Sequence, residues 1–253
     1  VRRHKQSLNK IDNLIATHLT MSHESLIISQ LSTVNCQLFN CQLSTVNCQL
    51  SPFPMNKIAL FGTSADPPTA GHKTILSWLS QHFDWVAVWA SDNPFKSHQT
   101  SLEHRSAMLL LMIQEINSPR HNLCLYPELS SPRTLETVEK AKSMWPDAEL
   151  TLVIGSDLVG QLPRWYKIEE LLKQVQLLVV PRPGYSPDNL DLWQLRRIGA
   201  EVAIASLSAP NVSSTSYRET GDTEALTPPI EAYINREHLY AWHEAQKRAK
   251  VAH

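Results

Sequence analysis

The chain contains five short, almost uninterrupted apolar runs separated by amphipathic stretches. No other feature of the sequence restricts the possible folds as strongly. Such runs are typical of strands covered on both faces, as in a parallel sheet. Strands that alternate with helices imply right-handed βαβ crossovers. We therefore expect an α/β fold: a Rossmann-like doubly wound parallel sheet of about five strands with flanking helices, in a single domain. The runs are Lys57–Gly62, Trp85–Ala90, Leu150–Gly155, Val175–Val180 and Glu201–Ser206.

The stretches between and after these runs predict helices with recognisable ends. Thr100 and Glu103 have the spacing of a capping box, and Ser131-Pro132 supplies a capping hydroxyl and a proline suited to the first turn. Pro146 is expected to end the helix that Ser131-Pro132 opens. The predicted helices run from Leu102 to about Ile116, from Thr134 to Trp145, from Glu169 to Gln174, and from Pro228 to about Val251 as one or two helices.

Residues 1–54 differ in character from the rest of the chain. The segment Gln30–Leu38 recurs almost unchanged as Gln42–Leu50, but two copies are too few to build a solenoid. Cys36, Cys41 and Cys48 lack the paired spacing of a zinc site, so we predict no metal ligands here. The segment also lacks the pattern of a signal peptide. We expect a disordered appendage, or translated upstream sequence ahead of Met55, and one folded domain over residues 55–253.

Charge and hydropathy exclude two classes of partner. With 23 Lys and Arg against 24 Asp and Glu, the formal net charge of the 253 residues is −1. That balance gives no electrostatic reason to bind nucleic acid or an anionic membrane. No run of about 18 apolar residues is present, so a transmembrane helix is not expected.

The loop after the first apolar run carries the strongest chemical signal. Ligands of open α/β sheets bind at the carboxyl ends of the strands, and this run ends in the loop Phe61–His72. The loop contains neither G-x-G-x-x-G nor a P-loop lysine motif. It does contain Thr69-x-Gly71-His72, in which Gly71 allows close backbone approach and His72 lies at a helix amino terminus, where an anion is favoured. The alternative is an ordinary turn with a surface histidine.

This loop resembles the (H/T)-x-G-H signature of the nucleotidyltransferase superfamily, and its surroundings resemble bacterial nicotinate-nucleotide adenylyltransferases. Further segments are similar to motifs of that family and follow in the family's order. They are Asn93–Lys96, Glu128–Thr137, Gly155-Ser-Asp157 with Leu162–Trp165, Pro181–Tyr185 and Val212–Arg218.

The resemblance implies a cytoplasmic enzyme of NAD biosynthesis. It would transfer AMP from ATP to nicotinate mononucleotide and release pyrophosphate, with Mg²⁺ bound through the ATP phosphates. Such a transfer needs no nucleophilic side chain, so catalysis would come from positioning and charge stabilisation. Three alternatives stay open: a nicotinamide-mononucleotide adenylyltransferase, a phosphopantetheine adenylyltransferase, and a catalytically silent nucleotide-binding module. Whether the chain forms a homo-oligomer also stays open.

The resemblance assigns roles to individual residues. His72, Thr69 and Arg218 would be catalytic, while Lys96 would meet the mononucleotide phosphate, Thr134 would bind substrate, and Trp165 would stack on the pyridine ring. Each has a simpler alternative: Ser213 and Asp157 as helix caps, Trp165 as core filling, Lys96 as a solvated charge. The ATP-binding residues would be Gly62, Thr63, Ser64, Gly71, His72, Gly155, Asp157, Ser213, Thr215 and Arg218.

Overall fold

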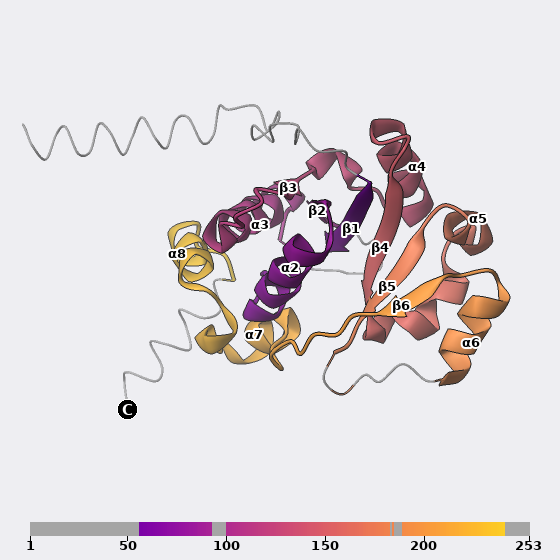
Figure 1. The fold of residues 1–253 in the computed structure, drawn as a ribbon. Helices are drawn as coiled ribbons and strands as arrows, with labels where there is room; N and C mark the ends of the chain where they lie inside the picture. The colour runs from indigo at the N-terminus through magenta and orange to yellow at the C-terminus, as the bar shows by residue number, and fades with distance from the viewer. Residues whose placement is uncertain (1–55, 93–99, 183, 185–188, 241–253) are drawn as a thin grey trace, which may run out of the picture. The chain divides into compact units, whose positions relative to one another are not determined.

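The protein is described by a computed structural model that covers residues 56–92, 100–182, 184 and 189–240. These residues form an α/β domain around one six-stranded, fully parallel sheet with the strand order β3-β2-β1-β4-β5-β6 (Figure 1). The doubly wound sheet is therefore confirmed. Residues 1–54, including the expected appendage, lie outside the described residues. The strands are β1 (Lys57–Thr63), β2 (Trp85–Ala90), β3 (Leu123–Leu125), β4 (Glu149–Gly155), β5 (Gln176–Val180) and β6 (Val202–Ile204).

The sixth strand is β3, which was not predicted from the sequence. It has only three residues, too few to show a hydrophobic period, and it pairs with β2 at the edge of the sheet. The five expected strands are all present. Their ends differ from the prediction by one residue in β1, β4 and β5, and β6 is the shortest of them, Val202–Ile204.

Both faces of the sheet are covered, which explains the near-continuous apolar runs. In β1, Ile58 and Leu60 pack into one core, and Ala59 and Phe61 pack into the other. One core is closed by α2 (Ala70–His82), α3 (Leu102–Ile116), α7 (Ser214–Thr220), η3 (Thr223–Ala225) and α8 (Pro228–Arg236). The other core is closed by η1 (Pro127–Leu129), α4 (Thr134–Met144), η2 (Ser156–Arg164), α5 (Ile168–Leu172) and α6 (Asn189–Arg197) (Figure 1).

The helices predicted to begin at Leu102 and Thr134 do begin there, as α3 and α4, but their predicted capping residues are wrong. The cap of α3 is Ser101, whose Oγ accepts from the His104 N–H at 3.3 Å, because Thr100 is engaged elsewhere in the fold. The cap of α4 is Arg133, and Ser131 instead donates to the Glu136 carboxylate at 2.6 Å. The expected helix Glu169–Gln174 is α5, shifted to Ile168–Leu172.

The predicted helix from Pro228 is α8, which ends at Arg236, and residues 241–253 lie outside the described residues. Among the described residues, no helix combines the length and apolar character that crossing a membrane requires.

The strand order places the functional edge of the domain. The chain leaves β1 toward β2 and leaves β4 toward β5, in opposite directions across the sheet. Beside such a reversal the loops at the carboxyl ends of the two strands diverge and leave a crevice for ligands. Thr63 ends β1 and Gly155 ends β4, so both flank this point.

Gly62 is required by packing within the sheet. It lies opposite Trp89 in the register of β1 and β2, and Trp89 is only 3% exposed. A Cβ atom on Gly62 would lie 2.5 Å from the Trp89 ring. The missing side chain therefore makes room for a buried indole next to the loop between β1 and α2.

We predict that Gly62→Ala lowers the free energy of unfolding by about 1–3 kcal/mol, because the buried ring has to move. Urea unfolding of the full chain measures the change. Gly71→Ala is the matched control, since its Cβ would meet no atom closer than 3.5 Å. Equal stability of Gly62→Ala and the unchanged protein would contradict this role of Gly62.

Candidate functional site

The loop between β1 and α2 turns sharply and buries most of its residues. Ala65 has a φ of 46°, in the left-handed region, and is fully buried. Asp66 and Thr69 are each 1% exposed, which is unusual for polar residues in a surface connection. Because these polar residues are buried, each of their polar groups needs a hydrogen-bond partner.

His72 is held at both ring nitrogens by this loop. The Thr69 backbone N–H donates to Nδ1 of His72 at 3.0 Å, and Thr69 Oγ1 lies 2.9 Å from the same nitrogen. Because a backbone N–H can only donate, Nδ1 must be an acceptor, and the ring proton must be on Nε2. Nε2 then donates to Thr63 Oγ1 at 3.0 Å. The ordinary surface histidine considered from the sequence is thereby excluded, since His72 is 7% exposed.

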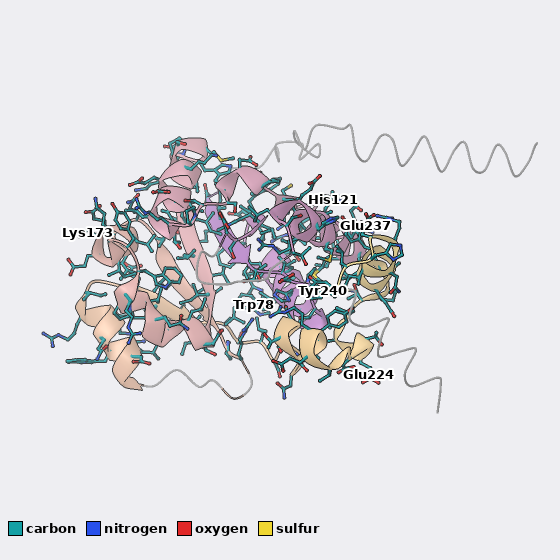
Figure 2. The ribbon with its side chains drawn as sticks, turned by 180° about the vertical axis from the view of Figure 1, so that it is seen from behind. Trp78, His121, Lys173, Glu224, Glu237 and Tyr240 are labelled. Carbon is teal, nitrogen blue, oxygen red and sulfur yellow. The ribbon has the colours of Figure 1, made fainter. Side chains whose placement is uncertain are left out.

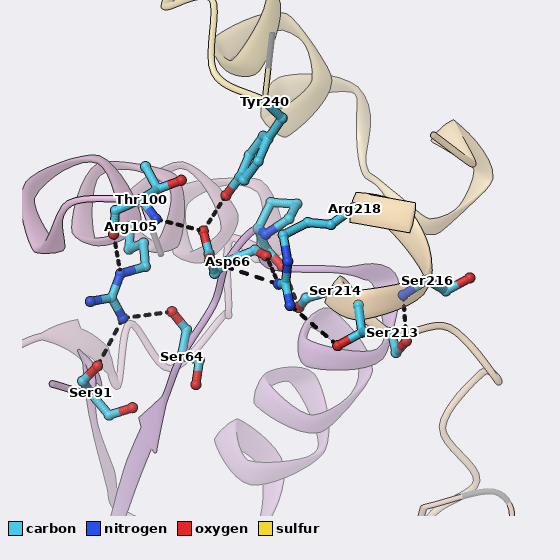
Figure 3. A network of polar contacts seen from close by, with 12 residues as sticks. Ser64, Asp66, Ser91, Thr100, Arg105, Ser213, Ser214, Ser216, Arg218 and Tyr240 are labelled. Carbon is cyan, nitrogen blue, oxygen red and sulfur yellow. Dashed lines mark hydrogen bonds and ion pairs between the residues drawn. The ribbon is translucent and has the colours of Figure 1, made fainter. Parts of the chain in front are cut away.

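Helix α7 docks directly onto the same loop. Ser214 donates through Oγ to the Pro67 carbonyl at 2.7 Å, and Arg218 donates through Nη1 to the Asp66 carbonyl at 2.5 Å (Figure 3). These contacts join segments about 150 residues apart in the sequence. They bring the predicted residues of the Val212–Arg218 motif to the loop that carries Thr69 and His72.

The hydroxyls at the start of α7 are partly used within the helix. Ser213 caps α7, its Oγ accepting from the Ser216 N–H at 3.0 Å, as the sequence suggested. Thr215 Oγ1 accepts from Arg218 Nη2 at 3.3 Å. Two nitrogens of Arg218 thus donate hydrogen bonds within the protein, while one third of its side chain is exposed. A cation held in this way presents its remaining N–H groups to an anion.

The end of β4 carries a second group of predicted residues. Asp157 lies in the first turn of η2 and pairs through Oδ2 with Arg182 Nη1 at 3.1 Å. Its other oxygen, Oδ1, is buried without a hydrogen-bond partner. A Cβ on Gly155 would collide with that oxygen, so Gly155 leaves room for the carboxylate. Asp157 therefore offers an acceptor without a hydrogen-bond partner, whereas no role was predicted for Arg182.

The residues expected on the substrate side lie on the other face. Trp165 follows η2, is half-buried and packs against the core beneath α4 and α5, so the simpler core-filling interpretation is at least partly correct. Thr134 is the first residue of α4. The Arg133 guanidinium lies 4.4 Å from the ring centre of Tyr166, which brings these two segments together. Lys96 lies outside the described residues.

Two residues that the sequence did not single out organise the loop. Arg105 is 3% exposed and donates to three backbone carbonyls: Thr100 at 2.8 Å, Ser64 at 3.0 Å and Ser91 at 2.8 Å (Figure 3). Burial lowers the pKa of its guanidinium. Tyr240 donates its hydroxyl hydrogen to Asp66 Oδ1. Neither residue belongs to a motif, and an arginine inside an amphipathic helix pattern gives no signal of its own.

The site as a whole is a set of donors rather than of metal ligands. Imidazole, guanidinium, hydroxyl and backbone N–H groups converge around the loop Ser64–Thr69 and the start of α7. Within the described ranges, no group of three or more His, Cys, Asp or Glu side chains is placed to hold a metal ion. This arrangement is suited to binding an anion such as a phosphate chain.

Comparisons with known proteins identify the same family that the sequence motifs resemble. Residues 60–220 match the family model described as cytidylyltransferase-like. The chain is 41% identical over 197 residues to a probable nicotinate-nucleotide adenylyltransferase of Synechocystis sp., covering 73% of this chain and 98% of that protein. It is 30% identical over 196 residues to the nicotinate-nucleotide adenylyltransferase of Bacillus subtilis, covering 74% and 99%.

A solved structure shares the fold at lower identity. It is the Plasmodium falciparum nicotinic acid mononucleotide adenylyltransferase complexed with NaAD, with a TM-score of 0.65, 20% identity, and coverage of 74% of this chain and 98% of that one. At that identity the likeness bears on the fold alone.

Proposed function

Because the chain belongs to the nicotinate-nucleotide adenylyltransferase family, we propose that it transfers AMP from ATP to nicotinate mononucleotide and releases pyrophosphate. The product is nicotinate adenine dinucleotide. The single observation that carries this proposal at the level of the site is the docking of α7 on the β1–α2 loop, which places Arg218 and His72 around one loop.

The reaction suits a site without a protein nucleophile. An oxygen of the mononucleotide 5′-phosphate attacks the α-phosphorus of ATP, a new P–O bond forms, and the bond to the pyrophosphate oxygen breaks. Negative charge moves onto the leaving pyrophosphate, so donors aimed at that charge lower the barrier. His72 donates through Nε2–H and Arg218 through its guanidinium, and neither has to form a covalent bond.

Each group on the loop then has a specific task. The Thr69 contacts fix the His72 ring so that its proton is on Nε2, the nitrogen that faces Thr63 at the end of β1. A ligand phosphate can replace Thr63 Oγ1 as the acceptor of that proton. Arg218 and Thr215 bind the β- and γ-phosphates from α7. Gly71 is expected to let the backbone approach the phosphates closely, and a Cβ there would be in ordinary contact with Thr69 and Val212, at 3.5 and 3.7 Å.

The remaining residues bind the two ends of the reactants. Asp157 Oδ1 is a buried oxygen without a partner and accepts a hydrogen bond from a ribose hydroxyl. Trp165 and Thr134 contact the pyridine nucleotide, and the role of Lys96 at its phosphate stays a prediction because Lys96 lies outside the described residues. Mg²⁺ bound through the ATP phosphates supplies further charge neutralisation. A cytoplasmic location stays a prediction, and the oligomeric state stays open, as in the sequence analysis.

The reaction is tested with the full chain, ATP, Mg²⁺ and one acceptor at a time, by following pyrophosphate release and identifying the dinucleotide. We expect nicotinate mononucleotide to be the preferred acceptor over nicotinamide mononucleotide and phosphopantetheine. A preference for the amide would keep the mechanism and change the substrate. No turnover with any acceptor, together with measurable ATP binding, would contradict the proposal and favour a silent nucleotide-binding module.

Loss of His72 should reduce turnover strongly. We predict that His72→Ala lowers kcat about 10²-fold, the usual cost of removing one transition-state donor, whereas a loss of less than about threefold would refute its role. His82→Ala is the matched control, because His82 lies at the other end of α2 and stacks on Trp78. Steady-state rates of the two variants are compared at saturating ATP, with Tm measured to confirm that both are folded.

A further inference from the structure

We propose that Asp66 and Tyr240 are positioning residues for adenylyl transfer, which hold the Arg218 guanidinium in the orientation that receives the ATP phosphates. The inference rests on the proposed function and gives a role in it to two residues that were not assigned to the site from the sequence. Figure 3 shows the network: Asp66 lies between Tyr240, Thr100 and Arg218, which come from three separate parts of the chain.

The Asp66 carboxylate is buried and incompletely satisfied. At 1% exposure it accepts at Oδ1 from the Thr100 N–H at 3.2 Å and from the Tyr240 hydroxyl. Its other oxygen, Oδ2, has no hydrogen-bond partner and lies 3.7 Å from Arg218 Nη1. A buried carboxylate of this kind needs a nearby cation, because burial without compensation is costly. Arg218 is therefore drawn toward Oδ2 without a full hydrogen bond.

The two cations near Asp66 differ in their freedom to move. Arg105 has donated to three backbone carbonyls and is 3% exposed, so it is fixed. Arg218 is one third exposed, and its contact with Oδ2 is longer than a hydrogen bond. Arg218 can thus exchange the attraction of Asp66 for that of an arriving phosphate while its contact with the Asp66 carbonyl keeps it in place.

Tyr240 connects the two parts whose relative placement matters. Its hydroxyl binds Asp66 on the β1–α2 loop, and its ring packs edge-on against Tyr217 of α7, with ring centres 5.9 Å apart. Tyr217 directly precedes Arg218. Burial and the hydrogen bond to Asp66 raise the pKa of Tyr240, so the hydroxyl remains a donor. Tyr240 and Trp78 of α2 pack against the same core (Figure 2).

The expected consequence concerns Arg218 rather than the fold. Without the Tyr240 hydroxyl, Asp66 Oδ1 loses a donor, and the carboxylate turns to the nearest mobile cation. Arg218 then forms a full hydrogen bond with Asp66 and is withdrawn from the phosphates. We expect Tyr240→Phe to lower kcat/KM for ATP about tenfold, the scale of one hydrogen bond to a charged group.

A double-mutant cycle in the full chain separates positioning from a structural effect. Tyr240→Phe, Arg218→Ala and the double variant are compared with the unchanged protein by kcat/KM for ATP. If Tyr240 acts through Arg218, its loss costs about tenfold in the unchanged protein and less than about twofold in the Arg218→Ala background. A merely structural role would cost the same factor in both. Tyr233→Phe is the matched control, since the Tyr233 hydroxyl contacts His104 at 2.9 Å.

A binding readout keeps the test independent of turnover. The same four proteins are titrated with pyrophosphate in a calorimeter, and Tyr240→Phe should raise Kd only where Arg218 is present. Equal effects in both backgrounds, or no effect in either, would overturn the role of Asp66 and Tyr240. An unchanged protein that binds pyrophosphate but transfers no AMP would overturn the proposed function. The cycle measured by pyrophosphate binding would then still decide the role of Asp66 and Tyr240. An unchanged protein that transfers AMP but does not bind pyrophosphate would leave the proposed function standing and overturn the role of Asp66 and Tyr240.

Discussion

A buried carboxylate has to be matched by donors and by opposite charge, and at Asp66 this requirement draws four distant segments together. The Thr100 N–H, the Tyr240 hydroxyl and the Arg218 guanidinium all converge on its side chain, and Arg105 lies near enough to be affected by its charge. The β1–α2 loop is thereby fixed against α7 and the start of α3. The proposed phosphate site depends on this contact between the loop and α7, because the loop positions His72 and α7 carries Arg218.

The chemistry of the site depends on which polar groups remain available once the β1–α2 loop and α7 are in contact. Three backbone carbonyls of the loop, those of Ser64, Asp66 and Pro67, accept hydrogen bonds from Arg105 and from α7. The groups that remain toward a ligand are N–H and hydroxyl donors. A site of this composition stabilises developing negative charge by preorganised donors, which is the requirement of a transfer between phosphates. In the proposed reaction the base and sugar ends would bind elsewhere along the strand ends, where Asp157 has a buried oxygen without a hydrogen-bond partner.

Much of the fold and the phosphate loop could be predicted, because both depend on local patterns. Continuous apolar runs indicate doubly covered strands, and Thr69, Gly71 and His72 lie at fixed spacing where a strand meets a helix. The remainder depends on contacts between distant residues. Tyr240 and Asp66 are 174 residues apart, so no window of sequence contains their interaction. The cap of α3 was misplaced for the same reason, because Thr100 is recruited by Asp66.

The central claim is that AMP passes directly between two phosphates held by donors, without a covalent bond to the protein. The most direct test uses ATP that carries sulfur at the α-phosphorus in one known configuration, with nicotinate mononucleotide as acceptor. A single in-line displacement predicts that the dinucleotide product has the inverted configuration at that phosphorus. Retention would require two displacements through an adenylylated side chain and would contradict the account.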